Sequence, residues 1–279
     1  GFERMVQENK DQIPTVMGEA FYAEAQTILN DSKDLVPFKT GALSSSGRVH
    51  DPFRVGEQVG EIERMGRLKR FLSPQVANAV ISSGEENILS SHRALIGILF
   101  CDIRGFTAFC ETAELEETIE FLQTYHEEMG KLINAHGAGV DHRWGDGIMV
   151  IFNDPFPCED PAGDALRLGL AMREKMEDIC QRWKRLGHRL GFGVGISLGY
   201  ATVGMVGSAG RFDYTASGTA VNLAARLCDH AEDGEILLSP RAYTAVEDDF
   251  QAESTGEMTF KGIRQPVEVF RVAGEKADA

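Results

Sequence analysis

The sequence has little of what membrane or secreted proteins carry. No stretch approaches the roughly 18 uninterrupted apolar residues that a membrane-spanning helix needs, and no basic-then-apolar leader opens the chain. The five cysteines include no Cys-x-x-Cys pair, and an odd, scattered set is typical of reduced thiols in the cytosol. We therefore expect a cytoplasmic chain without a membrane segment of its own. Because it begins with Gly1 rather than Met, it is compatible with a fragment from which a membrane or sensor segment is missing.

Positive charge is also scarce. The chain has 28 Lys and Arg residues against 43 Asp and Glu residues, which gives a formal net charge of −15. An acidic protein is not expected to wrap nucleic acid, so we exclude nucleic acid as a partner. An anionic substrate would need metal ions and local arginines to offset this field. Apolar residues make up 43% of the chain, which suffices for a buried core, and the 279 residues predict one or two domains.

Two aspartates lie at glycine-containing turns, each beside an apolar run that predicts a buried strand. Asp102 lies in the segment 96–107, and Asp146 lies in the segment 140–152. A carboxylate in such a place is held by stiff backbone and points out of the sheet. Two of them, with free backbone amides nearby, suit Mg²⁺, which takes hard oxygen ligands from carboxylates and substrate phosphates. The alternative is that both are ordinary turn or capping residues.

A third segment, residues 211–227, predicts a helix from Ala220 onward. Asn222 and Arg226 are four residues apart and share one face of that helix, while apolar residues cover the other directions. An amide donor and a guanidinium on one face suit a phosphate whose charge changes during a reaction. The alternative is a core helix with a solvated arginine.

The hydrophobic periodicity of the whole chain predicts an α+β fold. The expected elements are a strand over 94–102, an amphipathic helix over 112–134, a hairpin over 138–152 that turns at 144–147, a helix over 161–186, a glycine-rich strand pair over 190–206, a short strand over 235–238, and a closing hairpin from 250–260 and 266–272. Their order is the ferredoxin-like βαββαβ arrangement, an antiparallel-rich sheet with helices packed on one face.

Residues from about 66 to 272 resemble the catalytic domain of class III nucleotide cyclases, the family of most adenylate and guanylate cyclases. Three motifs in order carry the resemblance: Phe100-Cys101-Asp102-Ile103-Arg104-Gly105-Phe106-Thr107, then Gly145-Asp146-Gly147, then Tyr214-Thr215 with Val221-Asn222-Leu223-Ala224-Ala225-Arg226. Motifs this long and specific are not expected to occur together by chance.

The resemblance implies how these residues act. Asp102 and Asp146 would bind two divalent metal ions, Mg²⁺ or Mn²⁺, with help from the Ile103 carbonyl. Asn222 and Arg226 would stabilise the transition state at the ribose and the α-phosphate. The resemblance also implies a head-to-tail homodimer, in which the metal residues come from one chain and Asn222 and Arg226 from the other.

The substrate-binding residues match the family less completely. Phe106 and Thr107 of the first motif are expected to contact the substrate. At the first base-reading position adenylate cyclases usually carry Lys and guanylate cyclases Glu, whereas this chain has His142. Thr215 matches the second position, and Thr219 stands where the family often has Asp. A histidine donates or accepts a hydrogen bond depending on its tautomer, so His142 would favour adenine without enforcing it; the alternative is a half-exposed strand residue with no ligand.

The sequence thus predicts an adenylate cyclase that converts ATP to 3′,5′-cyclic AMP and pyrophosphate by a two-metal mechanism at a dimer interface. One alternative is a guanylate cyclase or one of relaxed specificity. Another is a catalytically weak module of the same fold that binds nucleotide and signals by dimerisation. The complete set of Asp102, Asp146, Asn222 and Arg226 favours catalysis, whereas His142 and Thr219 keep the alternatives open.

Four parts are expected along the chain: an N-terminal extension of unknown role over 1–62, a helical linker similar to the family's transducer segment over 63–92, the catalytic domain over 93–273 and a tail over 274–279. The extension is expected to be short and helical, with a helix over 13–32. Residues from about 13 to 60 weakly resemble a phage tail-completion protein. A regulatory or dimerising extension is the preferred interpretation.

Overall fold

The computed structural model describes residues 90–138, 140–208 and 211–276. The predicted extension, the helix over 13–32, the segment similar to phage proteins and nearly all of the linker lie outside the described residues. The elements are β1 (His92–Arg104), α5 (Phe106–Thr112), α6 (Leu115–Ala135), β2 (Val140–Trp144), β3 (Gly147–Phe152), α7 (Pro161–Arg185), β4 (Gly191–Ser208), β5 (Arg211–Ser217), α8 (Thr219–His230), β6 (Ile236–Leu238), α9 (Pro240–Val246), β7 (Phe250–Met258) and β8 (Val267–Glu275).

The strands form one sheet whose order is β2-β3-β1-β4-β6-β8-β7, and β5 pairs with β4 outside this path. Within it, β4 and β6 run parallel, and the other pairs are antiparallel. The first four strands of the path, with α6 and α7 between them in sequence, have the ferredoxin-like arrangement, so the predicted fold class is confirmed. The predicted closing hairpin is formed by β7 and β8, and β8 continues past the expected domain end at 273.

Helix ends follow local sequence signals. The side chain of Asp160 accepts a hydrogen bond from the Gly163 amide at 2.9 Å, and Pro161 follows at the first helical position of α7. Gly187, with φ of 96°, follows the end of that helix. In α6, Glu114 and Glu117 form a capping box. These signals explain why α7 matches its predicted range within one residue, while α6 begins three residues later than predicted.

The prediction was wrong in three local respects. The expected strand pair over 190–206 is a single long strand, β4, whose hairpin partner is β5. The short helices α5 and α9 were not predicted. Helices also cover both faces of the sheet, not one. The strand-pair error has a physical cause, because the glycines of β4 resemble turn signals but serve close packing.

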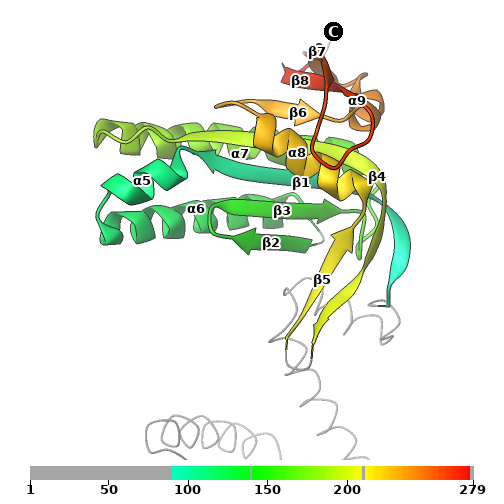
Figure 1. Cartoon of the computed structure of the whole chain (residues 1–279), viewed down its shortest axis with the longest axis horizontal. Helices are drawn as coiled ribbons and strands as arrows, with labels where there is room; N and C mark the ends of the chain where they lie inside the picture. Colours follow the sequence, from blue (N-terminus) through cyan, green and yellow to red (C-terminus); the bar gives the residue numbers. More distant parts are fainter. Residues whose placement is uncertain (1–89, 139, 209–210, 277–279) are drawn as a thin grey trace, which may run out of the picture. The chain divides into compact units, whose positions relative to one another are not determined.

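Alternating residues of β1 show the two faces. Leu99 and Cys101 pack in a core with α6 and α7, while Ile96 and Ile98 pack in a second core that includes Val221 of α8. Figure 1 shows α8 crossing the sheet on a different side from α6. Side chains that point from β1 toward α8, including that of Asp102, therefore share one face of the sheet.

Helix α8 lies close to β4 because small residues recur at every second position of that strand. A Cβ atom at Gly195 would lie 2.1 Å from the backbone nitrogen of Cys228 and 2.3 Å from the carbonyl oxygen of Ala224. Ser197, two residues on, donates a hydrogen bond from its hydroxyl to the Ala220 carbonyl at 2.6 Å. The backbone of α8 therefore rests on the backbone of β4, and this contact sets the height of the helix above the sheet.

Candidate functional site

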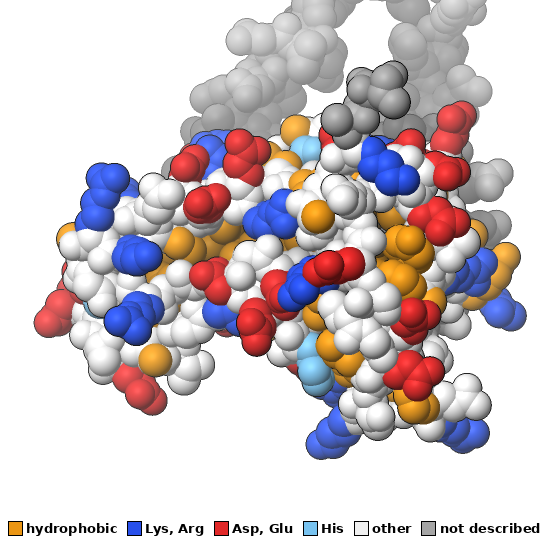
Figure 2. Space-filling view, turned by 90° about the horizontal axis from the view of Figure 1, so that it is seen from above, with side chains coloured by type: hydrophobic (Ala, Val, Ile, Leu, Met, Phe, Trp, Pro, Cys, Tyr) orange, Lys and Arg blue, Asp and Glu red, His pale blue; other side chains and the backbone are white. Residues whose placement is uncertain are grey.

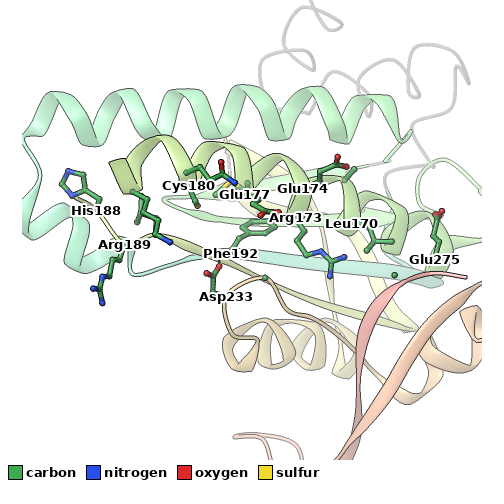
Figure 3. Close-up of a pocket in the computed structure, with 17 residues that line it drawn as sticks. Leu170, Arg173, Glu174, Glu177, Cys180, His188, Arg189, Phe192, Asp233 and Glu275 are labelled. Carbon is green, nitrogen blue, oxygen red and sulfur yellow. Dashed lines mark hydrogen bonds between the residues drawn. The ribbon is translucent and has the colours of Figure 1, made fainter. Parts of the chain in front are cut away.

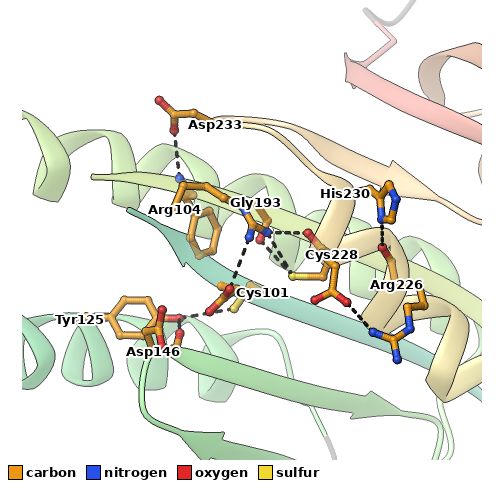
Figure 4. A network of polar contacts seen from close by, with 12 residues as sticks. Cys101, Arg104, Tyr125, Asp146, Gly193, Arg226, Cys228, His230 and Asp233 are labelled. Atoms are coloured by element: carbon orange, nitrogen blue, oxygen red, sulfur yellow. Dashed lines mark hydrogen bonds and ion pairs between the residues drawn. The ribbon is translucent and has the colours of Figure 1, made fainter. Parts of the chain in front are cut away.

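The two predicted carboxylates meet at one end of the sheet. Cys101 is paired with Ile148 across β1 and β3, so Asp102 lies beside the turn that carries Asp146. Asp102 itself is within β1 and opposite Gly193 of β4, which corrects the expectation that it lies in a turn. Figure 4 shows this region, with Asp146 beside Tyr125 and the residues of β1.

The electrostatics of this pair indicate a shortage of positive charge. The pKa of Asp146 is raised to about 6, mainly by burial and in addition by the charge of Asp102 and a hydrogen bond between the two side chains. Arg104 acts in the opposite direction and lowers that pKa. Two hard carboxylates this close, one of which has a raised pKa beside the other, are a suitable donor set for a divalent cation.

Few side chains of the described residues are placed to bind a metal ion at this site. Within 90–138, 140–208 and 211–276, no group of three or more His, Cys, Asp or Glu side chains is placed to hold a metal ion. Two carboxylates and the Ile103 carbonyl fit ions that complete their coordination with substrate phosphates and water, as Mg²⁺ commonly does. The Ile103 side chain is buried in the core with α6 and α7, so its backbone is the part available to the site.

Helix α6 holds the turn that carries Asp146. The hydroxyl of Tyr125, which is fully buried, donates to the backbone carbonyl of Asp146 at 3.0 Å, and Nε2 of His126 donates to the carbonyl of Gly145 at 2.8 Å. Neither residue was predicted from the sequence. The sequence signal for them was two adjacent aromatic side chains with polar groups within a predicted amphipathic helix. When such a side chain is buried, its polar group usually has a hydrogen-bond partner.

Arg104 connects the carboxylate site to α8. Its Nη1 lies 3.4 Å from Oδ2 of Asp102, and its Nη2 donates to the carbonyl of Cys228 near the end of α8. A Cβ atom at Gly193 would lie 2.5 Å from Nη2, so the guanidinium occupies space that only glycine leaves free. Figure 4 shows these contacts. Sequence reasoning missed this link, although Arg104 has the same strand parity as Asp102.

Asn222 and Arg226 lie one turn apart on α8, as predicted from their spacing. Asn222 is exposed, and Nη1 of Arg226 forms an ion pair with Oδ2 of Asp229 at 2.8 Å. The described part of the chain has no hydrogen bond or ion pair between these two residues and Asp102 or Asp146. One chain therefore assembles the two pairs as separate groups (Figure 4).

The two expected base-reading residues are brought to neighbouring positions. Nε2 of His142, on β2, donates to the backbone carbonyl of Tyr214 on β5 at 2.8 Å, and Thr215 is the next residue. A carbonyl only accepts, so Nε2 must carry the hydrogen. The neutral ring then presents Nδ1 as an acceptor. This contact favours one of the two tautomers that the sequence left open.

The remaining predicted residues lie at the start of α5. Phe106 is half-buried, and its ring centroid is 6.1 Å from those of Phe109 and Phe121. Thr107 is exposed in the first turn of the helix, directly after Gly105, whose φ is 79°. The Phe106 side chain thus serves the core, while the backbone amides of this turn have no partner within the helix.

A groove of about 1320 Å³ lies elsewhere, along α7, the start of β4 and the end of β8 (Figure 3). None of the predicted site residues lines it. Its charges alternate in sign, with Arg173, Lys184 and Arg189 beside Glu174 and Glu177. Acidic and basic side chains are likewise interspersed over the face shown in Figure 2, with hydrophobic side chains exposed between them. The groove shows no preference for an anionic or a cationic ligand.

Residues 89–274 match the family model described as the adenylate and guanylate cyclase catalytic domain. The chain belongs to this family. The crystal structure of the adenylyl cyclase CyaB from P. aeruginosa is 36% identical, with a TM-score of 0.65, and the match covers 68% of this chain and 100% of that one. The guanylyl cyclase Cya2 is 33% identical, with a TM-score of 0.63, covering 67% and 95% of the two chains.

Curated relatives of this cyclase domain are longer proteins. An adenylate cyclase of Anabaena cylindrica is 34% identical over 167 residues, which are 57% of this chain and 32% of the relative. Adenylate cyclase 1 of Rhizobium meliloti is 27% identical over 251 residues, 82% of this chain and 37% of that protein. The chain therefore spans about a third of these relatives' length. No helix in the described parts of the cyclase chain is long and apolar enough to cross a membrane.

Proposed function

We propose that this cyclase domain converts ATP to 3′,5′-cyclic AMP and pyrophosphate. The observation that carries the proposal is the pairing of Asp102 with Asp146 at the end of the sheet, where burial and mutual repulsion raise the pKa of Asp146 to about 6. The relatives named adenylate cyclase support the choice of substrate class. A relative of similar identity is named guanylyl cyclase, so the choice of ATP rests on His142 and Thr215.

The chemistry is an intramolecular displacement. The 3′-oxygen of the ribose attacks the α-phosphorus, the bond from that phosphorus to the bridging oxygen breaks, pyrophosphate leaves, and the hydroxyl proton passes to water. Asp102, Asp146 and the Ile103 carbonyl would hold two Mg²⁺ or Mn²⁺ ions. Such ions lower the pKa of the hydroxyl and neutralise the phosphates.

The protein groups supply position and charge. Asn222 would orient the ribose, and the guanidinium of Arg226 would stabilise the charge that grows on the α-phosphate. The backbone amides of Phe106 and Thr107 would contact the phosphates, since they have no helical partner. His142 and Thr215 would face the base, with Nδ1 of His142 as an acceptor for the exocyclic amine of adenine.

We also propose a head-to-tail homodimer. The two functional pairs lie apart within one chain, so a complete site would combine Asp102 and Asp146 of one protomer with Asn222 and Arg226 of its partner. The partly exposed guanidinium of Arg226, whose ion-pair partner among the described residues is Asp229 on its own helix, is available for such a role. Residues 63–92 would link this dimer to the extension over 1–62, and the cytoplasm is the proposed location.

The test is a product assay on the purified chain with each of ATP, GTP, CTP and UTP, and with Mg²⁺ or Mn²⁺. Cyclic AMP as the main product, dependent on the metal, supports the proposal. Cyclic GMP in excess would transfer the function to guanylate cyclisation. Nucleotide binding without any cyclic product would favour the non-catalytic module. Asp248→Asn, which changes an exposed aspartate of the same chain, is the matched control for Asp102→Asn.

A further inference from the structure

A series of hydrogen bonds, joined through the covalent structure of Tyr214, runs from the start of β1 to the expected base-reading residues. Nδ1 of His92 donates to the carbonyl of Ser90 at 2.9 Å, and Nε2 of His92 donates to Oδ2 of Asp154 at 2.7 Å. The other carboxylate oxygen of Asp154 accepts from the hydroxyl of Tyr214. The backbone carbonyl of Tyr214 accepts from Nε2 of His142 at 2.8 Å.

The fold explains why residues so distant in sequence meet. His92 pairs with Val203 of β4, and Tyr214 of β5 pairs with Met205 of the same strand. Figure 1 shows the first part of β1 curving alongside β4 near the β4–β5 hairpin. Asp154 follows β3 and reaches the same place, because Asn153 beside it donates to the Leu95 carbonyl at 2.8 Å. Side chains from β1 and β5 thus meet at one carboxylate that follows β3.

The burial of this carboxylate requires an explanation. Asp154 is 6% exposed and Tyr214 is 3% exposed, while the side chain of His92 is 42% exposed. A buried charge is costly unless it is paired and hydrogen-bonded. Both ring nitrogens of His92 face acceptors, so the ring satisfies both contacts only as the imidazolium. The partly exposed imidazolium thereby supplies the counter-charge for the buried carboxylate.

We propose that His92, Asp154 and Tyr214 form a positioning relay that holds Thr215, and through the Tyr214 carbonyl the ring of His142, against the nucleotide base. The role as base readers rests on the proposed function, but the relay itself is a property of these contacts. None of the three residues needs to touch the substrate. They fix the separation of β5 and β2, and hence the place of the acceptor nitrogen of His142.

The relay also predicts a pH dependence. The pKa of His92 is raised above 6.5, first by the hydrogen bond to Ser90 and then by Asp154. Val203, opposite on β4, is uncharged, and the guanidinium of Arg93 lies over the ring of Tyr200 instead. Because the pKa is raised, the relay is complete below pH 6.5 and is lost as the pH rises through the higher value.

The experiment measures KM and kcat for ATP and GTP in Tyr214→Phe, which removes the hydroxyl and keeps the ring and the carbonyl. A lost hydrogen bond to a charged group typically costs a factor of about ten, so we expect the ATP-to-GTP ratio of kcat/KM to fall by about fivefold to tenfold. KM should rise while kcat stays within about twofold, since the reacting groups are unchanged. Tyr243→Phe is the matched control, because Tyr243 lies in α9 and stacks on Phe270.

His92→Gln is the second variant. Residue 92 is partly exposed, and thermal unfolding is measured alongside to check that the variant is folded. Glutamine supplies an amide donor but cannot become charged. The rise of KM with pH above 6.5 should flatten in His92→Gln, while the pH profile of kcat keeps its shape. A purely structural role would lower the unfolding temperature and the active fraction without changing KM or the base ratio.

A double-mutant cycle in unfolding free energy separates the two proposals. His92→Gln and Tyr214→Phe should be non-additive, because both act on Asp154, whereas His92→Gln and Tyr243→Phe should add. If the parent protein makes no cyclic nucleotide, the proposed function fails. The double-mutant cycle still tests the relay, because it measures unfolding free energy and not activity. Additive effects, or an unchanged base ratio and KM in folded and active Tyr214→Phe, would overturn it.

Discussion

The hydroxyl of Tyr125 and the backbone carbonyl of Asp146 are joined by a hydrogen bond of 3.0 Å, which ties the core of α6 to the turn that carries a proposed metal ligand. The same hydroxyl also lies 3.6 Å from Sγ of Cys101, the residue before Asp102. The buried hydroxyl of Tyr125 therefore contacts the backbone of Asp146 and the residue that precedes Asp102. We expect the spacing of the two carboxylates to depend on this residue of α6, which lies outside β1 and outside the turn of Asp146.

Tyr125→Phe should loosen this turn. We expect a loss of about 1 kcal/mol in unfolding free energy, the usual value of one hydrogen bond, and a higher concentration of Mn²⁺ or Mg²⁺ for half-maximal activity. Denaturant unfolding and a metal titration of activity measure the two effects. Tyr243→Phe, which removes the same atom from α9, should leave the metal titration unchanged. An unaltered titration in Tyr125→Phe would remove the turn from the account of metal binding.

Replacement of either proposed metal ligand should abolish turnover without loss of the fold. Asp102→Ala and Asp146→Ala each remove one carboxylate of a close pair in which Asp102 raises the pKa of Asp146, so metal-free stability should stay equal or increase. Product formation and thermal unfolding without metal are the measurements, with Asp248→Ala at an exposed position as the control. Turnover within a few-fold of the parent in either variant would show that the metal assignment is wrong.

Mixing two inactive variants should restore activity if the site is shared between protomers. An Asp102→Ala chain lacks a metal ligand, and an Arg226→Ala chain lacks the transition-state group. Random pairing at equal concentrations makes half of the dimers mixed, each with one intact site, so we expect about a quarter of the parental activity. Absence of recovery, with mixed dimers demonstrated by differently tagged chains, would place all four residues in one protomer's site.

The identity of residue 142 should control base selectivity. His142 presents Nδ1 as an acceptor, whereas a lysine reaches further, only donates, and is the residue that adenylate cyclases usually carry at this position. One hydrogen bond to the base is worth about fivefold in discrimination. We expect a modest preference for ATP over GTP in the parent and a sharper one in His142→Lys, with the metal dependence unchanged. Competition assays with both nucleotides measure this. Equal ratios in the parent, His142→Lys and His142→Ala would mean that residue 142 does not face the base.

Gly195→Ala should be costly although it adds one methyl group. That methyl would meet the backbone of α8 at 2.1 Å, and backbone cannot rotate away as a side chain can. Overpacking of this kind costs about 1–3 kcal/mol, and displacement of α8 should reduce activity further. Gly274→Ala is the matched control, because a Cβ there would meet nothing within 4 Å. Equal stability of the two variants would contradict the close contact of β4 and α8.

The sequence predicts the fold well where one signal dominates. Helix α7 was predicted nearly to the residue, because Pro161 and Gly187 mark its two ends. The spacing of Asn222 and Arg226 likewise placed both on one face of α8. Periodicity and caps are local, and local signals survive folding.

Features that depend on distant partners were not predicted. Gly195 resembles a turn former in sequence, and only the position of α8 shows that it is a contact point within a strand. Arg104 and Tyr125 join elements far apart in the chain, and no spacing rule connects them to Cys228 or Asp146. The roles of the site residues themselves stay predictions, which the experiments above address.

The small-residue stripe of β4 limits how this domain can diverge. Most strand positions accept a range of branched residues, so their sequences drift freely within one hydrophobic class. At Gly195 there is no smaller residue to exchange with, and any larger one must be accompanied by a shift of the whole of α8. Such a shift would carry Asn222 and Arg226 with it. Variation at this buried position, which is not itself a proposed nucleotide contact, is therefore a sensitive marker for relatives in which the geometry of the site has changed.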